Sequence, residues 1–151
     1  MCRTHNIAER MFKKYDNKVP QGDKEDYFAS FLEYRQTVID YTSKLIENVE
    51  CKYDYIYIYC VSVFALATQR IFKISGFDVE CFIDQNNAFR GKTYSGVMVE
   101  IPSQAFLRVK NSEIPKILVV VCTQQEKTFR KISLNLEMRG LSKKQVIFHS
   151  F

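Results

Sequence analysis

Three small residues stand at the spacing of a phosphate-binding turn. In the stretch Cys60-Val61-Ser62-Val63-Phe64-Ala65, the first, third and sixth residues fall in register with the glycines of a GxGxxG or GxGxxA turn. The first glycine of such a turn permits a tight bend, the second lets the backbone approach a pyrophosphate, and the third position allows a helix and a strand to pack closely. The spacing therefore predicts a strand-to-helix turn in which side chains replace two of the glycines.

Those side chains bear directly on ligand binding. A Cβ at Cys60 disfavours a positive φ, and a Cβ at Ser62 crowds a bound phosphate. The N-terminus of the following helix still offers N–H groups and a positive dipole to an anion, with Val63 just before it, and the hydroxyl of Ser62 adds a donor. Two interpretations stay open: a weak anion site, or a turn that kept its packing and lost its ligand.

Two further residues belong to the same predicted site. Asp84 ends the second predicted strand, 24 residues after Cys60, where an acidic side chain accepts hydrogen bonds from ribose hydroxyls in a dinucleotide site. Thr123 follows the third predicted strand and faces the same crevice if the strand order reverses between the first and third strands. The predicted binding residues are Cys60, Ser62, Val63, Asp84 and Thr123. The cofactor stays unknown.

The sequence offers little for catalysis or metal binding. A thiol at a helix N-terminus, such as Cys60, can have a lowered pKa, but no histidine lies near it in the sequence. There is no CxxC pair, and the two histidines are His5 and His149, so the clustered ligands of a zinc site are missing. We therefore predict no catalytic residue and no metal ligand, and favour a binding module over an enzyme.

The charge of the chain is uneven. Residues 1–50 carry eight Lys and Arg against nine Asp and Glu, whereas residues 51–151 carry fourteen against eight. A basic second part favours an anionic ligand or simply aids solubility, and no Lys/Arg run exceeds two, so no nucleic-acid partner is predicted. No apolar run reaches the roughly 20 residues of a membrane span. With no visible signal peptide and five cysteines, the sequence predicts a cytoplasmic protein with reduced thiols.

The second part of the chain alternates strands and helices. Strands are predicted over residues 53–59, 78–84, 116–122 and 145–149, and helices over 64–74, 103–110 and 125–139, with Ser103 as a helix cap. Residues 85–102 are predicted to be one long connection. This alternation predicts an α/β, Rossmann-like parallel sheet of order 2-1-3-4 with helices on both faces, within a domain of residues 51–151.

The first 50 residues are predicted to form a helical extension. A short helix over residues 3–14 is followed by a breaker and then by a long amphipathic helix from about Asp23, its N-cap, to Val49. That helix, about 40 Å long at 1.5 Å per residue, exceeds what a small sheet needs as cover. Its apolar stripe is explained equally by packing on the following domain and by a homodimer or a protein partner.

The segment from residue 53 to the end also resembles a known family. The matching features are the strand-turn-helix of residues 55–72, the phrase GFDVECFID (76–84), the loop NAFRGKTYSGVMVEIPSQAFL (87–107), the strand KILVVVC (116–122) and the closing LEMRGLSKKQVIFHSF (136–151). They resemble the Rossmann-like N-terminal domain of bacterial sugar O-acyltransferases and similar modules of other surface-polysaccharide biosynthesis proteins. In that family the domain helps bind a nucleotide-linked sugar, while a separate left-handed β-helix, whose hexapeptide repeats are missing here, carries acyl transfer.

Two functions follow as expectations. The first is a non-catalytic nucleotide or nucleotide-sugar binding module, NAD(P)-binding-like in fold, in bacterial polysaccharide biosynthesis. The alternative is a degenerate Rossmann-like structural or interaction module that has lost its ligand, in which Phe64 or another bulky side chain fills the crevice and the protein is a dimer. An oxidoreductase ranks third, because it needs a glycine turn and a positioned proton donor, and the sequence shows neither clearly.

Overall fold

The computed structural model describes residues 24–49 and 53–150, with side chains from residue 32 onward. The chain divides into two compact units, Met1–Arg35 and Gln36–Phe151, so the boundary falls inside a helix. The predicted helix over residues 3–14 and the predicted cap Asp23 lie outside the described residues. The domain boundary at residue 50 stays a prediction.

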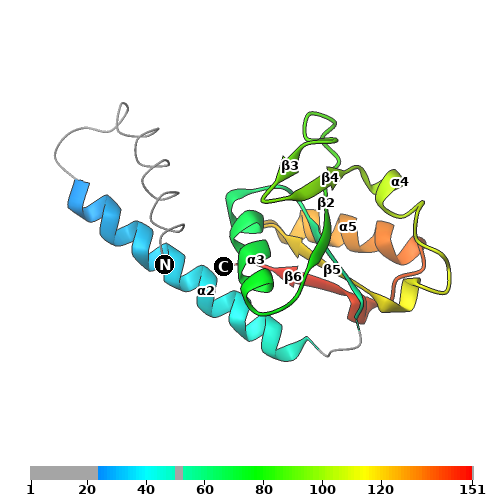
Figure 1. Cartoon of the computed structure of the whole chain (residues 1–151), viewed down its shortest axis with the longest axis horizontal. Coiled ribbons are helices and arrows are strands. Elements are labelled where there is room, and N and C mark those ends of the chain that lie inside the picture. Colours follow the sequence, from blue (N-terminus) through cyan, green and yellow to red (C-terminus); the bar gives the residue numbers. More distant parts are fainter. Residues whose placement is uncertain (1–23, 50–52, 151) are drawn as a thin grey trace. The chain divides into compact units, whose positions relative to one another are not determined.

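The second unit is built around a six-stranded sheet of order β3-β4-β2-β1-β5-β6 (Figure 1). Every neighbouring pair is parallel except β3 with β4, which is antiparallel. The strands are β1 (Tyr55–Tyr59), β2 (Val79–Ile83), β3 (Thr93–Tyr94), β4 (Val97–Glu100), β5 (Ile117–Cys122) and β6 (Val146–His149).

The predicted order is confirmed and extended. The four predicted strands are β2, β1, β5 and β6 in their predicted arrangement, and β4 adds a fifth parallel strand beside β2. Counted along the chain, the parallel strands have the order 3-2-1-4-5 of a Rossmann-like sheet. The order reverses between β1 and β5, so the topological switch point, where ligands bind in such sheets, lies after these two strands.

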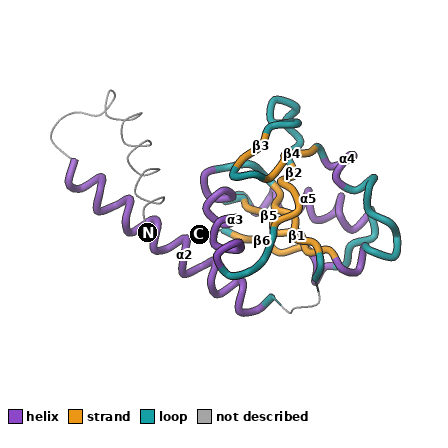
Figure 2. The backbone as a smooth tube through the Cα atoms, viewed as in Figure 1, coloured by secondary structure: helices purple, strands orange, loops and turns teal. Residues whose placement is uncertain are grey.

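The prediction of one long connection over residues 85–102 is wrong, because it contains the β3–β4 hairpin at the sheet edge (Figure 2). Ser95 and Gly96 form the turn and both have positive φ, 51° and 82°. Two consecutive positive φ values match the right-handed twist of a hairpin, and Gly tolerates them without strain. Ser-Gly between β-forming residues was the sequence signal for this hairpin.

The helices that accompany the sheet follow the sequence in most places. They are α2 (Lys24–Asn48), α3 (Val63–Ile74), α4 (Pro102–Ala105) and α5 (Glu126–Met138). Gly76 and Gly140 follow the ends of α3 and α5 with φ of 89° and 99°, a conformation that ends a helix readily when the residue is Gly. The prediction of a Ser103-capped helix over 103–110 is wrong: α4 is one turn long, and its N-cap is Ile101, with Pro102 as the first helical residue.

Alternating side chains of the strands bury two faces of the sheet. The tyrosines of β1 pack with β2, β5 and α5 in one core that includes Tyr57, Tyr59, Ile83, Val119 and Leu136. The isoleucines of β1 point to the opposite face, which α3 covers through its own buried side chains, Phe64, Ala65, Thr68, Gln69 and Phe72. Helices therefore lie on both faces, as predicted, with α3 on one and α4 and α5 on the other (Figure 1).

The part of α2 from Gln36 onward belongs to the sheet-bearing unit. Val38 and Thr42 are buried, and the Thr42 hydroxyl lies 3.1 Å from Nε2 of His149, at the end of β6. The ring of His149 stacks on Phe64 of α3 with 4.8 Å between ring centroids. One buried histidine thus joins α2, α3 and the edge strand of the sheet. Within the described residues, no helix combines the length and the apolar character needed to cross a membrane.

Candidate functional site

The turn after β1 keeps the backbone shape of a glycine although it carries a side chain. Cys60 has φ of 74°, a left-handed conformation that a side chain disfavours. Its N–H donates to the carbonyl of Ile83 at 2.8 Å, which ties the turn to the end of β2. Cys60 therefore adopts the positive φ that its Cβ disfavours, because the surrounding bonds hold the residue in that conformation against its local preference.

The second glycine position is used to cap α3. Ser62 is extended, with φ of −156°, so its backbone needs no glycine. Its Oγ accepts a hydrogen bond from the N–H of Ala65 at 3.0 Å, the usual role of an N-cap serine. Val63 begins the helix and is about half exposed, at 54%. One of the N–H groups that an anion would seek is thus occupied by the chain itself.

Asp84 engages the turn as well. One carboxylate oxygen accepts the N–H of Val61 at 2.8 Å, and the other accepts the N–H of Asn86 at 2.8 Å. The backbone N–H of Asp84 donates to the carbonyl of Glu100 at 3.0 Å, which fixes the residue between β2 and β4. The structure therefore brings Asp84 to the predicted turn, but with both oxygens already bonded to backbone donors.

Thr123 lies where the sequence places it, directly after the last residue of β5. Because β5 is the parallel neighbour of β1, Thr123 and the turn at Cys60 follow adjacent strands on the two sides of the switch point. The Thr123 hydroxyl accepts the N–H of Gln125 at 3.2 Å, near the start of α5. This hydrogen bond holds the Thr123 hydroxyl within its own loop.

The Cys60 thiol is not activated by the helix that follows it. Burial, and next the negative charge of Asp84, raise its pKa to about 11. The thiols of Cys81 and Cys122 are buried in the sheet, and burial raises the pKa of Cys81 to about 12. At neutral pH these three free thiols stay protonated, and protonated thiols are poor nucleophiles.

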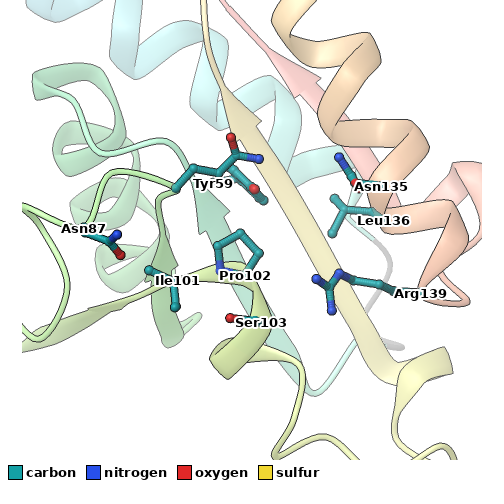
Figure 3. A pocket seen from close by; sticks show the side chains of 9 residues that line it. Tyr59, Asn87, Ile101, Pro102, Ser103, Asn135, Leu136 and Arg139 are labelled. Carbon is teal, nitrogen blue, oxygen red and sulfur yellow. The ribbon is translucent and has the colours of Figure 1, made fainter.

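A pocket of about 290 Å³ opens beside this turn, on the face of the sheet that carries α4 and α5 (Figure 3). Three neighbouring parallel strands supply residues to it just at or after their carboxyl ends: Tyr59 from β1, Gln85 and Asn87 after β2, and the segment from Ile101 to Ser103 after β4. Across the pocket, Asn135, Leu136 and Arg139 of α5 and its C-cap face this group. Its place fits the general position of ligand sites in parallel sheets.

The lining combines neutral hydrogen-bonding groups with apolar walls. Burial raises the pKa of Tyr59, and a hydrogen bond with Gln85 acts in the opposite direction. The guanidinium of Arg139 lies 5.7 Å from the ring centroid of Phe106, a cation–π arrangement that orients the one cation of the lining. Amides, hydroxyls and one guanidinium between apolar surfaces can hold a sugar or a planar base and orient it by hydrogen bonds.

Sequence reasoning missed these lining residues. None of the five predicted binding residues lines the pocket. The repeated Tyr-Ile pattern of β1 was the one available signal, because alternation puts all its tyrosines on one face of the sheet. Asn135 and Arg139 carry no such signal, since their place in the pocket depends on how α5 packs against the sheet.

Among the residues that the structure describes, no group of three or more His, Cys, Asp or Glu side chains is placed to hold a metal ion. No protein-family model matches the chain, and no curated protein matches it. Among solved structures, it is similar to a UDP-D-quinovosamine 4-dehydrogenase from Vibrio fischeri, at 15% identity and a TM-score of 0.51, over 64% of this chain and 77% of that one. This similarity supports the Rossmann-like fold.

Proposed function

We propose that this domain is a non-catalytic module that binds a nucleotide or nucleotide-sugar in bacterial carbohydrate biosynthesis. The observation that carries the proposal is the pocket at the carboxyl ends of β1, β2 and β4, next to the topological switch point. The solved structure with a similar fold is that of an enzyme named for a UDP-sugar, and the sequence resembles the N-terminal domain of sugar O-acyltransferases. Both favour a carbohydrate-linked ligand.

The chemistry of the pocket supports binding rather than catalysis. An acid–base catalyst works best with a pKa near the pH at which it operates. Burial moves the pKa of Tyr59 upward, away from neutrality. The guanidinium of Arg139 offers only hydrogen-bond donors. These groups orient a ligand and donate hydrogen bonds to it, while a reaction would have to be supplied by another domain or protein.

A calorimetric titration of the full chain with UDP-sugars, NAD and coenzyme A tests the proposal. We expect saturable binding of at least one of these ligands, and a loss of at least about tenfold in affinity on Arg139→Ala, because a hydrogen bond to a charged group contributes about 1.5–3 kcal/mol. Ser103→Trp, which fills the pocket, should weaken binding further.

Matched controls are available on the same elements. Arg130→Ala removes an exposed arginine of α5 that pairs with Glu126, and Ser112→Trp adds the same bulk to an exposed loop serine. Both should bind as the wild type does. No heat of binding across the whole panel, or equal weakening by the control variants, would contradict the proposal.

The bonds at the turn favour a second candidate, an interaction module that has lost its ligand. Asp84 and Ser62 occupy the N–H groups of Val61 and Ala65, which leaves fewer donors for a phosphate. One expectation of this candidate is not met by Phe64, which is buried against His149 and does not line the pocket. Silence in the titration together with a dimer in sedimentation would favour this candidate.

A further inference from the structure

The carboxylate of Asp84 is bound where a ligand anion would be expected. Phosphates at strand-to-helix turns are held by backbone N–H groups and by the positive end of the helix dipole. Here the N–H of Val61, which directly follows the left-handed Cys60, donates instead to Asp84 Oδ2 at 2.8 Å. The turn therefore already holds a negative charge from its own chain.

The position of this carboxylate is fixed from several sides. Asp84 is bonded through its N–H to Glu100 of β4, and its second oxygen accepts the N–H of Asn86. The turn is fixed too, because the N–H of Cys60 donates to Ile83 at 2.8 Å. A phosphate would have to break the Val61 bond and approach a carboxylate that cannot easily move away. Like charges at such short range repel strongly in a partly buried site.

We propose that Asp84 is the specificity-determining residue of this domain: its carboxylate takes the place of a ligand phosphate on the turn and excludes phosphate from it. The ligand admitted to the adjacent pocket then presents a neutral sugar or nucleoside to Gln85, Asn87 and Ser103, and its phosphates, where it has them, point away from the turn. The exclusion of phosphate stands on the Asp84 contacts alone, whereas the class of ligand rests on the proposed function.

Inorganic pyrophosphate tests the exclusion directly, because it carries the phosphates that would bind to the turn and has no sugar or base to bind in the pocket. In the ¹⁵N-labelled full chain, we expect the amide signals of Val61, Ser62 and Val63 to stay unchanged up to about 10 mM pyrophosphate. In Asp84→Asn, which removes the charge and keeps the shape, the same signals should shift and saturate, with an affinity at least about tenfold higher than in the wild type.

Asp78→Asn is the matched control, because it removes an equal charge from an exposed position just before β2, at the opposite end of that strand. It should behave as the wild type does. Should Asp84→Asn lose its dispersed spectrum, Asp84→Ser provides the same charge removal with a smaller side chain. Pyrophosphate binding to the wild-type turn, or no gain in a folded Asp84 variant, would overturn the inference.

The ligand class has its own measurement. Uridine and UDP are titrated into the wild type and Asp84→Asn, and the variant is expected to raise the affinity for UDP relative to uridine by at least about tenfold. A wild type that binds neither these compounds nor any ligand of the calorimetric panel contradicts the proposed function, while the pyrophosphate result still decides the role of Asp84. A wild type that prefers UDP through shifts at the turn amides contradicts the role of Asp84 alone.

Discussion

Cys60 holds a left-handed backbone with a half-buried side chain, and the two properties have different causes. Its conformation is imposed by the bond from its N–H to Ile83 and by the Asp84 bond on the next residue. Its burial comes from packing against the core on the α5 face. At the residue scale, the turn therefore keeps the left-handed backbone of a glycine turn, while Asp84 and Ser62 accept two of the N–H groups that a ligand would use, those of Val61 and Ala65.

The thiol of Cys60 should react slowly in the native protein. With a pKa of about 11 in place of 9.0, its thiolate fraction at pH 8 is about 100-fold lower than that of an ordinary thiol. We expect iodoacetamide labelling of Cys60, followed by mass spectrometry, to be correspondingly slow at pH 8 and to rise about tenfold per pH unit toward pH 11. Labelling in urea, where burial is lost, provides the ordinary rate. Rapid labelling of the folded chain at pH 7 would contradict this prediction.

At the element scale, His149 joins three elements through buried contacts. Its Nε2 meets the hydroxyl of Thr42 on α2, and its ring stacks on Phe64 of α3. Only 4% of the residue is exposed, and burial lowers its pKa to about 4. The packing of α2 and α3 at the β6 edge therefore depends on a neutral imidazole.

This burial predicts a loss of stability in acid. Above pH 6.5, His149 is neutral in both the folded and the unfolded chain, so its protonation does not lower the free energy of unfolding. As the pH falls from 6.5 to about 4, the unfolded chain takes up a proton that the folded chain does not, so the free energy of unfolding decreases, by about 3 kcal/mol in total. Urea unfolding between pH 4 and 8 measures this slope.

His149→Gln should remove this part of the pH dependence, because glutamine does not titrate. An identical slope in the wild type and in His149→Gln would show that His149 is not the group responsible.

At the scale of the whole molecule, the sheet-bearing unit begins at Gln36, inside α2. Val38 is 2% exposed and Thr42 is fully buried, so the later turns of α2 contribute to the core of this unit. This favours packing on the domain as the role of that part of the stripe. For the residues before Gln36, a homodimer or a partner remains a prediction.

Two truncations test where the folded unit begins. We expect a chain starting at Gln36 to unfold cooperatively in urea. A chain starting at residue 51 should be less stable than that by at least about 2 kcal/mol, because it loses the buried Val38 side chain and leaves His149 without its partner on α2. Equal stability of the two chains would place the boundary near residue 50 instead.

Much of the fold was predictable because local patterns specify it. The apolar run of β5, the Tyr-Ile alternation of β1 and the glycines after α3 and α5 each determine a strand or a helix end within a few residues. The alternation of these elements then favours a parallel sheet, and the order of the four predicted strands followed. The β3–β4 hairpin was missed because its strands are short, at two and four residues.

The candidate site, like the fold, could be predicted from the sequence only in part. The sequence by itself determined that small residues occupy the turn after β1 and that an aspartate stands at the carboxyl end of β2, since both are local facts. Only the tertiary structure decided that Asp84 bonds to Val61 and that Arg139 reaches the same pocket as Tyr59. The reason is physical: these contacts join residues far apart in the chain, and they exist only once the strands are paired and α5 has packed on the sheet.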